Sequence, residues 1–290
     1  MIARGFAAVA LLACLAASGA LAQTAWFAPQ EPVRIFGNTY YVGSQGLSAI
    51  LITSPQGHVL IDAPMAQNAS MIAANIRTLG FRVEDIRWIL NSHVHADHAG
   101  ATADLQQLSD AAVAARAASA RVLETGQAGP DDPQFGLSGA MKPVRGPVRV
   151  IGDGEILRAG SLALTALATG GHTPGGTSWS WRSCEGDRCL NLVYADSLNA
   201  ISADGFLYSN SRTYPTGVQD FERGFAALSA VPCDILITPH PEASQFWERI
   251  GRRDRGGDAN ALVGTGACRR YADAGRARLQ RRLESERETR

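Results

Sequence analysis

The chain has 290 residues, of which 46% are hydrophobic and 19% charged, which is ordinary for a globular protein. Its 27 basic residues balance 27 acidic residues, so the formal net charge is zero and the composition points neither to nucleic-acid binding nor to a polybasic membrane surface. The length permits one large domain or two small ones.

The first 22 residues have the features of a secretory signal peptide. A positive charge at Arg4 precedes an apolar run at residues 6–17 that is too short to span a bilayer, and a small-x-small cleavage site follows at Ala20–Ala22. The mature chain would then start at Gln23. The alternative is a lipoprotein box at Leu11–Cys14, which is disfavoured because the apolar run before Cys14 is unusually short. No later apolar run reaches membrane-spanning length, so we expect a soluble periplasmic protein with no membrane association after cleavage.

The segments that follow alternate between strand and helix patterns. Short strands separated by turns are predicted at residues 33–36, 39–42, 47–53 and 58–62. Residues 68–79 have helical spacing and end at Gly80, and residues 86–90 form an apolar strand. We interpret His58 as a residue at the edge of a turn, with a surface or hydrogen-bonding role.

A cluster of metal-binding side chains follows that apolar strand directly. Residues 91–100 hold three of the six histidines and one carboxylate, on a loop before a helix predicted at 101–108. His93 and His95 point the same way in an extended segment, so they can bind one ion, whereas Asp97 and His98 point differently and suit a second. Imidazole and carboxylate ligands favour a divalent metal such as zinc, and a hydroxide shared by two such ions is a strong nucleophile.

A strand predicted at residues 111–114 and a helix predicted at 117–124 lead into a long irregular segment. Residues 126–147 are rich in glycine, proline and aspartate and show no periodicity. A loop of this length is often a functional lid, and a disordered insertion is the alternative. Gln134 and Phe135 in this segment are candidates to face a substrate.

The second half of the chain adds two histidines at favourable points. Strands are predicted at residues 148–151, 154–157, 162–168, 178–181, 190–194 and 233–238, and helices at 221–229 and 258–284. His172 lies among glycines, as expected where the backbone passes close to a bound ion. His240 follows the last strand and is fixed between Pro239 and Pro241, which is a suitable position for a ligand.

Four cysteines remain once Cys14 leaves with the signal peptide, and an even number in an oxidising compartment suggests two disulfides. Cys184 and Cys189 flank a turn-like tetrapeptide and could join a hairpin, and Cys233 and Cys268 would then tie the C-terminal helix to the body. Buried free thiols are the alternative. Zinc binding by cysteine is disfavoured, because histidines already supply the ligands.

The order of these elements predicts an α/β fold. Strands then helices are followed by strands then helices again, although no sequence motif repeats. This order fits two β-sheets packed together with helices outside, in a single four-layer αβ/βα sandwich domain at residues 23–290.

Three motifs give the chain a specific resemblance to the metallo-β-lactamase superfamily. They are His93-Val94-His95-Ala96-Asp97-His98, Gly171-His172-Thr173-Pro174-Gly175 and Pro239-His240-Pro241. Within the superfamily the chain resembles subclass B3, because a third histidine follows the aspartate and Ser197 stands where other subclasses place a cysteine ligand. Cys233 and Cys268 also lie on either side of His240, like the C-terminal disulfide of that subclass.

The resemblance implies two zinc ions per chain, the first bound by His93, His95 and His172 and the second by Asp97, His98 and His240. It also implies that Asp97 is a catalytic residue that orients the attacking hydroxide, and that Ser197 contacts the substrate carboxylate. Asn199 stands where many relatives have serine or threonine, and together with Gln134 it completes the candidate substrate contacts.

The implied reaction is hydrolysis of the β-lactam amide bond of penicillins, cephalosporins and carbapenems, which confers antibiotic resistance, by a monomer without a nucleic-acid partner. One alternative is another hydrolase of the superfamily, a lactonase or a glyoxalase-type thioesterase. It would be favoured if Asp196, rather than Ser197, faced the metals. The other alternative is a non-catalytic exported zinc-binding protein, whose metal site would be closed by protein ligands alone.

Overall fold

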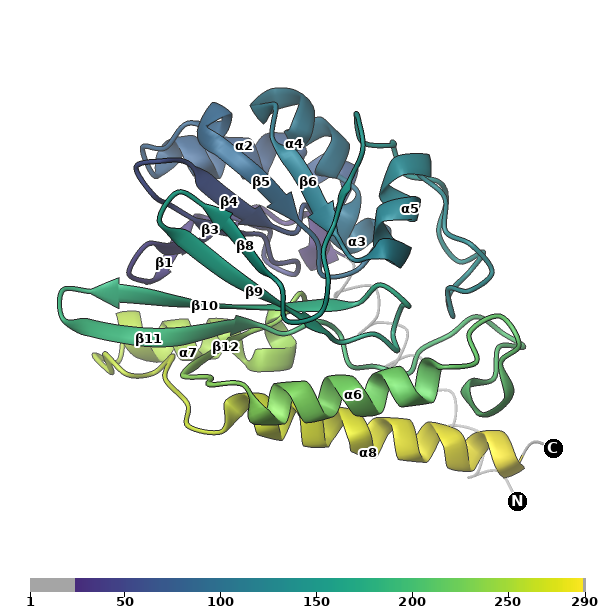
Figure 1. Cartoon of the computed structure of the whole chain (residues 1–290). Helices are drawn as coiled ribbons and strands as arrows, with labels where there is room; N and C mark the ends of the chain where they lie inside the picture. Colours follow the sequence, from purple (N-terminus) through teal and green to yellow (C-terminus); the bar gives the residue numbers. More distant parts are fainter. Residues whose placement is uncertain (1–23, 289–290) are drawn as a thin grey trace, which may run out of the picture.

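Two β-sheets face each other at the centre of the structure, which is a computed structural model that describes residues 24–288 (Figure 1). The signal peptide predicted at residues 1–22, with Cys14 and the cleavage site, lies outside the described residues. Within residues 24–288, no helix has both the length and the apolar character needed to cross a membrane.

The first sheet keeps its strands in chain order. They are β1 (Val33–Phe36), β2 (Thr39–Tyr41), β3 (Ile50–Ile52), β4 (His58–Ile61), β5 (Ile86–Leu90), β6 (Ala112–Ala115) and β7 (Arg149–Val150). β1 to β4 pair antiparallel through short connections, whereas β4 to β7 pair parallel, with helices in the crossovers between β4 and β6. The carboxyl ends of β4, β5 and β6 therefore lie at one edge of the sheet.

The second sheet is built on a long hairpin. Its order is β12-β11-β10-β9-β8, with β8 (Ile156–Ala159), β9 (Leu162–Ala168), β10 (Thr177–Glu185), β11 (Arg188–Tyr194) and β12 (Ile235–Ile237). β8 to β11 pair antiparallel and β12 pairs parallel with β11. The end of β9, the start of β10 and the ends of β11 and β12 consequently meet at one edge.

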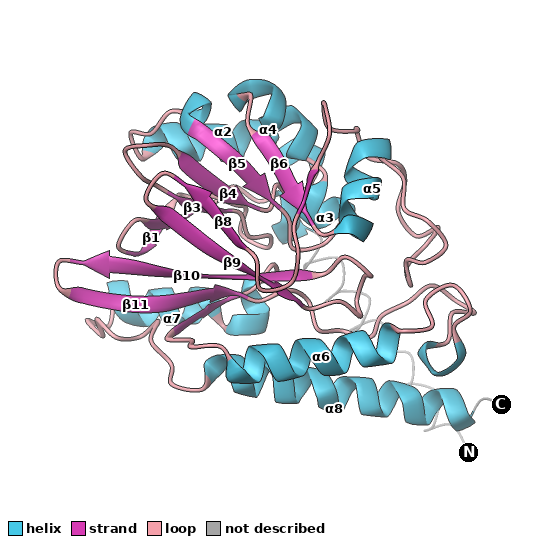
Figure 2. Ribbon diagram, viewed as in Figure 1, coloured by secondary structure: helices cyan, strands magenta, loops and turns pink. Residues whose placement is uncertain are grey.

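Apolar side chains on both faces of the sheets produce the four layers. In β3, Ile50 and Ile52 face the second sheet and Leu51 faces the helices, as the two-residue period of a strand requires. The outer face of the first sheet packs against α2 (Ala69–Thr78), α4 (Thr102–Ser109) and α5 (Ala117–Thr125). The second sheet packs against α6 (Gly217–Ala230) and α8 (Ala267–Glu288) (Figure 2). The predicted four-layer α/β sandwich is confirmed.

Some predicted boundaries are wrong. The helix predicted at residues 258–284 begins only at Ala267, because Gly264 and Gly266 disfavour a helical conformation in the preceding residues. The strand predicted at residues 47–53 is confined to β3. α7 (Phe246–Asp254) was not predicted, since only Phe246 and Ile250 give its buried apolar face a helical period.

His58 is a buried residue, so the surface role considered for it is wrong. It is the first residue of β4, and only 6% of its surface is exposed. The Ser54 N–H donates to its Nδ1 at 3.4 Å, and its ring packs edge-on against Phe81. The hydrogen-bonding role is therefore confirmed.

Both predicted disulfides are present. Cys184 and Cys189 are directly opposite residues in β10 and β11, so their bond closes the hairpin near its tip. Cys233 and Cys268, 35 positions apart, join the segment before β12 to the first turn of α8. The alternative of four free thiols is excluded.

Candidate metal centre

The predicted ligands meet where the edges of the two sheets adjoin. The cluster at residues 91–98 follows β5, and two further histidines follow β9 and β12, namely His172 and His240. The Trp179 indole N–H of β10 donates to the Asn91 carbonyl at 3.1 Å, which joins the second sheet to the start of the cluster. Side chains from distant parts of the sequence are thereby held on rigid strand ends.

The first group consists of His93, His95 and His172, whose ligand atoms lie within 4.8 Å of one another. The three ring centroids are 4.7 to 4.9 Å apart, and the rings are tilted by 78° to 88° to each other. The buried Nε2 of His93 has no hydrogen-bond partner within residues 24–288. An unpaired buried nitrogen is costly unless it binds something, so the group fits a metal ion.

The second group consists of Asp97, His98 and His240. Asp97 Oδ2 lies 3.2 Å from His98 Nε2 and 3.4 Å from His240 Nε2, and the two nitrogens are 3.2 Å apart. Zinc–ligand bonds of about 2.0–2.1 Å at tetrahedral angles separate ligand atoms by about 3.3 Å. These three atoms have that spacing. The His93 and His98 rings, with centroids 4.2 Å apart, place the two groups side by side.

Two histidines of the first group are oriented by hydrogen bonds at their Nδ1 atoms. His93 Nδ1 lies 2.8 Å from Asp196 Oδ1, and His172 Nδ1 lies 2.8 Å from the Asn199 carbonyl oxygen. A carbonyl oxygen only accepts, so Nδ1 of His172 carries the proton and its Nε2 has the lone pair that a metal requires. In His93 the Asp196 carboxyl engages Nδ1, and the unpaired Nε2 is the nitrogen left to bind a metal.

The protonation states of His93, His172 and Asp97 also suit a cation, whereas the pKa of His240 is raised, because the contact with Asp97 outweighs the effect of burial. Burial lowers the pKa of His93 well below its ordinary value and lowers the pKa of His172 to about 3, so both are neutral at pH 7. Burial opposes the charge of Asp97, but His98 and His240 outweigh it and hold the pKa of Asp97 well below its usual range. Neutral imidazole and ionised carboxylate are the forms that bind a divalent metal.

Asp62, directly after β4, lies beside His98 of the second group. Its Oδ1 accepts the Ser92 N–H at 2.6 Å, and its Oδ2 accepts the Ser92 and Tyr194 hydroxyls at 2.7 Å each. The same Oδ2 lies 3.7 Å from His98 Nδ1. This fully buried residue therefore lies beside His98 without a hydrogen bond to it, a position that the strand pattern did not predict.

The glycines beside His172 make room for protein side chains. A β-carbon at Gly171 would lie 2.4 Å from the Phe221 ring, and one at Gly176 would lie 2.5 Å from Asp196 Oδ2. The φ of Gly171 is 124°, which a residue with a side chain rarely adopts. Close packing of the His172 loop requires these glycines, which differs from the predicted approach to an ion.

A cavity of about 730 Å³ lies over both groups and is large enough for a small-molecule ligand. All three predicted substrate contacts line it, namely Ser197, Asn199 and Gln134. The side-chain nitrogen of Gln134 lies 3.3 Å from His172 Nε2, so the 126–147 loop reaches the first group. Trp26 also lines the cavity, with its ring 5.8 Å from that of His240.

Sequence reasoning missed two other residues of the site. Asp132 contacts His95 Nε2 with both carboxylate oxygens, at 3.1 and 3.2 Å. Asp196 was expected only as a possible bridging ligand, but it contacts His93 Nδ1 and belongs to neither group of candidate ligands. Asp132 follows another aspartate in a loop without periodicity, and this context gives no signal for its role.

A family model for the metallo-beta-lactamase superfamily matches residues 44–185. The structure is similar to that of Rm3 metallo-beta-lactamase, with 52% identity, a TM-score of 0.88, and coverage of 91% of this chain and 97% of that one. It is also similar to that of MEM-A1, a subclass B3 metallo-beta-lactamase from a soil metagenome library, with 47% identity, a TM-score of 0.88, and coverage of 91% of this chain and 100% of that one.

A curated relative, a probable metallo-hydrolase of Burkholderia pseudomallei, is 33% identical over 108 residues, which are 37% of this chain. The match spans only 34% of the length of that relative. By the identity and coverage of the solved structures, the chain belongs to the metallo-β-lactamase superfamily. Within the superfamily it resembles subclass B3, the subclass of the soil enzyme.

Proposed function

We propose that the protein hydrolyses the β-lactam amide bond of penicillins, cephalosporins and carbapenems and thereby confers antibiotic resistance. The observation that carries this function is the pair of adjacent ligand groups beneath a cavity lined by Ser197 and Asn199, in a chain that is 47% identical to a subclass B3 enzyme. Each group would hold one zinc ion, two per chain.

When bound, zinc supplies Lewis acidity and makes water nucleophilic at neutral pH. The ionised carboxylate of Asp97 borders the cavity and can accept a hydrogen bond from the attacking water, which orients it. Ser197 and Asn199 can donate hydrogen bonds to the carboxylate that β-lactams carry. Gln134, from the 126–147 loop, also lines the cavity and can donate to an acyl substituent of the substrate.

Two features argue against the alternative functions. Asp196 contacts Nδ1 of His93 and belongs to neither ligand group. It therefore does not act as the bridging aspartate expected for a lactonase or a glyoxalase-type thioesterase. The cavity of about 730 Å³ beside both groups would leave space for a substrate, which a purely structural zinc site does not need.

We propose that residues 1–22 are a cleaved signal peptide and that the mature monomer acts in the periplasm. The support is the apolar run before Ala20–Ala22 and the presence of two disulfides, which are typical of oxidising compartments. N-terminal sequencing of the exported protein should give Gln23; a lipidated Cys14 would exclude this cleavage site.

The function is tested with purified, zinc-loaded protein. We expect it to open the β-lactam ring of a penicillin, a cephalosporin and a carbapenem, observed as loss of the lactam absorbance. A chelator should abolish the activity and added zinc should restore it. The proposal is wrong if the zinc-loaded protein leaves both the penicillin and the carbapenem intact, and turnover of a lactone or thioester instead would favour the alternative hydrolases.

A further inference from the structure

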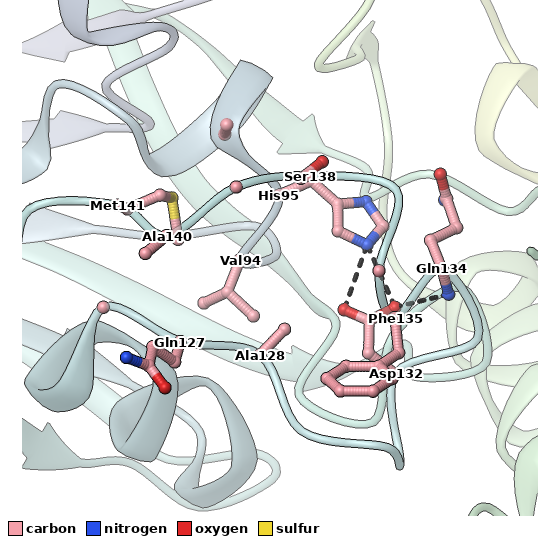
Figure 3. A pocket seen from close by; sticks show the side chains of 14 residues that line it. Val94, His95, Gln127, Ala128, Asp132, Gln134, Phe135, Ser138, Ala140 and Met141 are labelled. Atoms are coloured by element: carbon pink, nitrogen blue, oxygen red, sulfur yellow. Dashed lines mark hydrogen bonds and ion pairs between the residues drawn. The ribbon is translucent and has the colours of Figure 1, made fainter.

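Asp132 is a buried acid that the ligand groups do not include. It lies in the 126–147 loop, and only 5% of the residue is exposed. Its two carboxylate oxygens face His95 Nε2 at 3.2 and 3.1 Å, and Figure 3 shows the two side chains pointing toward each other. Both oxygens are therefore within hydrogen-bond distance of the same ring nitrogen.

His95 is oriented in the opposite sense to the other histidines of the first group. His93 and His172 are held at Nδ1 and present Nε2, whereas His95 is held at Nε2 and can present only Nδ1. Because both carboxyl oxygens of Asp132 face Nε2, they place an acceptor there, which favours the proton on Nε2 and the lone pair on Nδ1. Without Asp132, the proton of His95 could move from Nε2 to Nδ1, or the ring could rotate away from the first group.

Asp132 is also an anchor for the loop that carries it. Its Oδ1 accepts the Gln134 N–H at 2.8 Å, its own N–H donates to the Gly129 carbonyl at 3.0 Å, and its carbonyl accepts the Phe135 N–H at 3.0 Å. A cavity of about 220 Å³ separates this stretch from Val94 and the body of the protein (Figure 3). Beside this cavity, the contact of Asp132 with His95 and the Ala203 N–H donated to the Pro133 carbonyl at 2.8 Å join the stretch to the rest of the protein.

We propose that Asp132 is a positioning residue that fixes His95 as a ligand of the first metal group and couples the order of the 126–147 loop to metal binding. The proposal rests on the proposed zinc-dependent function. Its physical basis is reciprocal: an acceptor on Nε2 makes Nδ1 a better ligand, and a cation on Nδ1 makes Nε2–H a better donor to Asp132. Metal binding should therefore tighten the loop, which also carries Gln134 into the substrate cavity.

The first measurement is zinc affinity, determined by competition with a chelating dye. The replacement Asp132→Ala should lower the zinc affinity of one site, the one that contains His95, by about 10- to 100-fold. The affinity of the other site should remain nearly unchanged. Asparagine has the same size as aspartate and keeps one acceptor oxygen. The zinc affinity of Asp132→Asn should therefore lie between those of Asp132→Ala and the wild-type protein. The matched control is Asp131→Asn, which removes the same charge from the neighbouring position, where the carboxylate meets only the exposed Arg121 at 3.0 Å.

The second measurement is amide hydrogen exchange of residues 129–138 with and without zinc. In the wild-type protein and in Asp131→Asn, zinc should slow exchange in this stretch. In Asp132→Ala, zinc should have little effect there. A merely structural role would loosen the loop equally with and without zinc and would leave both zinc affinities intact, so the difference between the two conditions separates positioning from simple support.

The proposal is overturned if Asp132→Ala binds both zinc ions as tightly as the wild-type protein, or if zinc protects its loop to the same extent. It is also overturned if Asp131→Asn reproduces the losses of Asp132→Ala. None of these readouts uses a β-lactam. A wild-type protein that binds zinc but hydrolyses no β-lactam would therefore remove the proposed function alone, and the Asp132 variants would still decide this proposal.

Discussion

Replacement of His93→Ala is expected to lower kcat/KM for β-lactam hydrolysis by about 10³-fold or more. His93 is a fully buried member of the first group, its Nδ1 contacts Asp196, and its Nε2 has no hydrogen-bond partner within residues 24–288. Loss of this nitrogen removes a ligand from the first group, and a catalytic metal contributes several kcal/mol to the reaction, where each 1.4 kcal/mol is about tenfold in rate. Zinc content should fall from about two ions toward about one.

The control for this variant is His58→Gln. His58 is also a buried histidine, but it lies at the opposite end of β4 from Asp62 and contacts Phe81 and Ser54. It should retain two zinc ions and nearly full kcat/KM. Equal losses in both variants would mean that activity follows general stability, and a fully active His93→Ala would remove His93 from the ligand set.

Replacement of Asp62→Ala is expected to reduce the free energy of unfolding by about 3–5 kcal/mol, the usual effect of removing one partner from a buried polar network. Three donors from Ser92 and Tyr194 lose their acceptor in the interior. The φ of residue 62 is 61°, which alanine adopts less readily than aspartate. Because Asp62 Oδ2 also lies 3.7 Å from His98 Nδ1, its loss should lower the affinity for the second zinc as well.

Asp62→Asn separates the two causes of this loss. Asparagine tolerates the same backbone conformation and keeps one acceptor oxygen, so its loss of stability in chemical denaturation should be clearly smaller than that of Asp62→Ala. Denaturation midpoints of both variants close to that of the wild-type protein would show that the Asp62 contacts contribute little to the fold or to the site.

The layers of the fold are predictable because apolar periodicity is a local property. Each strand of the sandwich interior has apolar residues on both faces, as β3 does with Ile50, Leu51 and Ile52, and this pattern is visible without the rest of the chain. α7 is different, because Phe246 stacks on Tyr41 of the first sheet with ring centroids 5.2 Å apart. That contact joins residues 205 positions apart (246 − 41), so the sequence near Phe246 gives no sign of it.

The site was predictable to the extent that its side chains are unusual by themselves. Four candidate ligands are concentrated at residues 93–98, and His172 and His240 stand in distinctive glycine and proline contexts. The residues that orient them are ordinary aspartates in unremarkable contexts. Asp132 is 37 positions from His95 and Asp196 is 103 positions from His93, so only the folded structure shows these pairs.

Six side chains, positioned by the ends of strands from both sheets, are expected to hold two zinc ions side by side. The decisive measurement is a crystal structure of the zinc-loaded protein, with anomalous scattering recorded at the zinc edge. Two peaks per chain are expected, one bounded by His93, His95 and His172 and the other bounded by Asp97, His98 and His240. Peaks elsewhere, or no peak between these side chains at saturating zinc, would contradict the account.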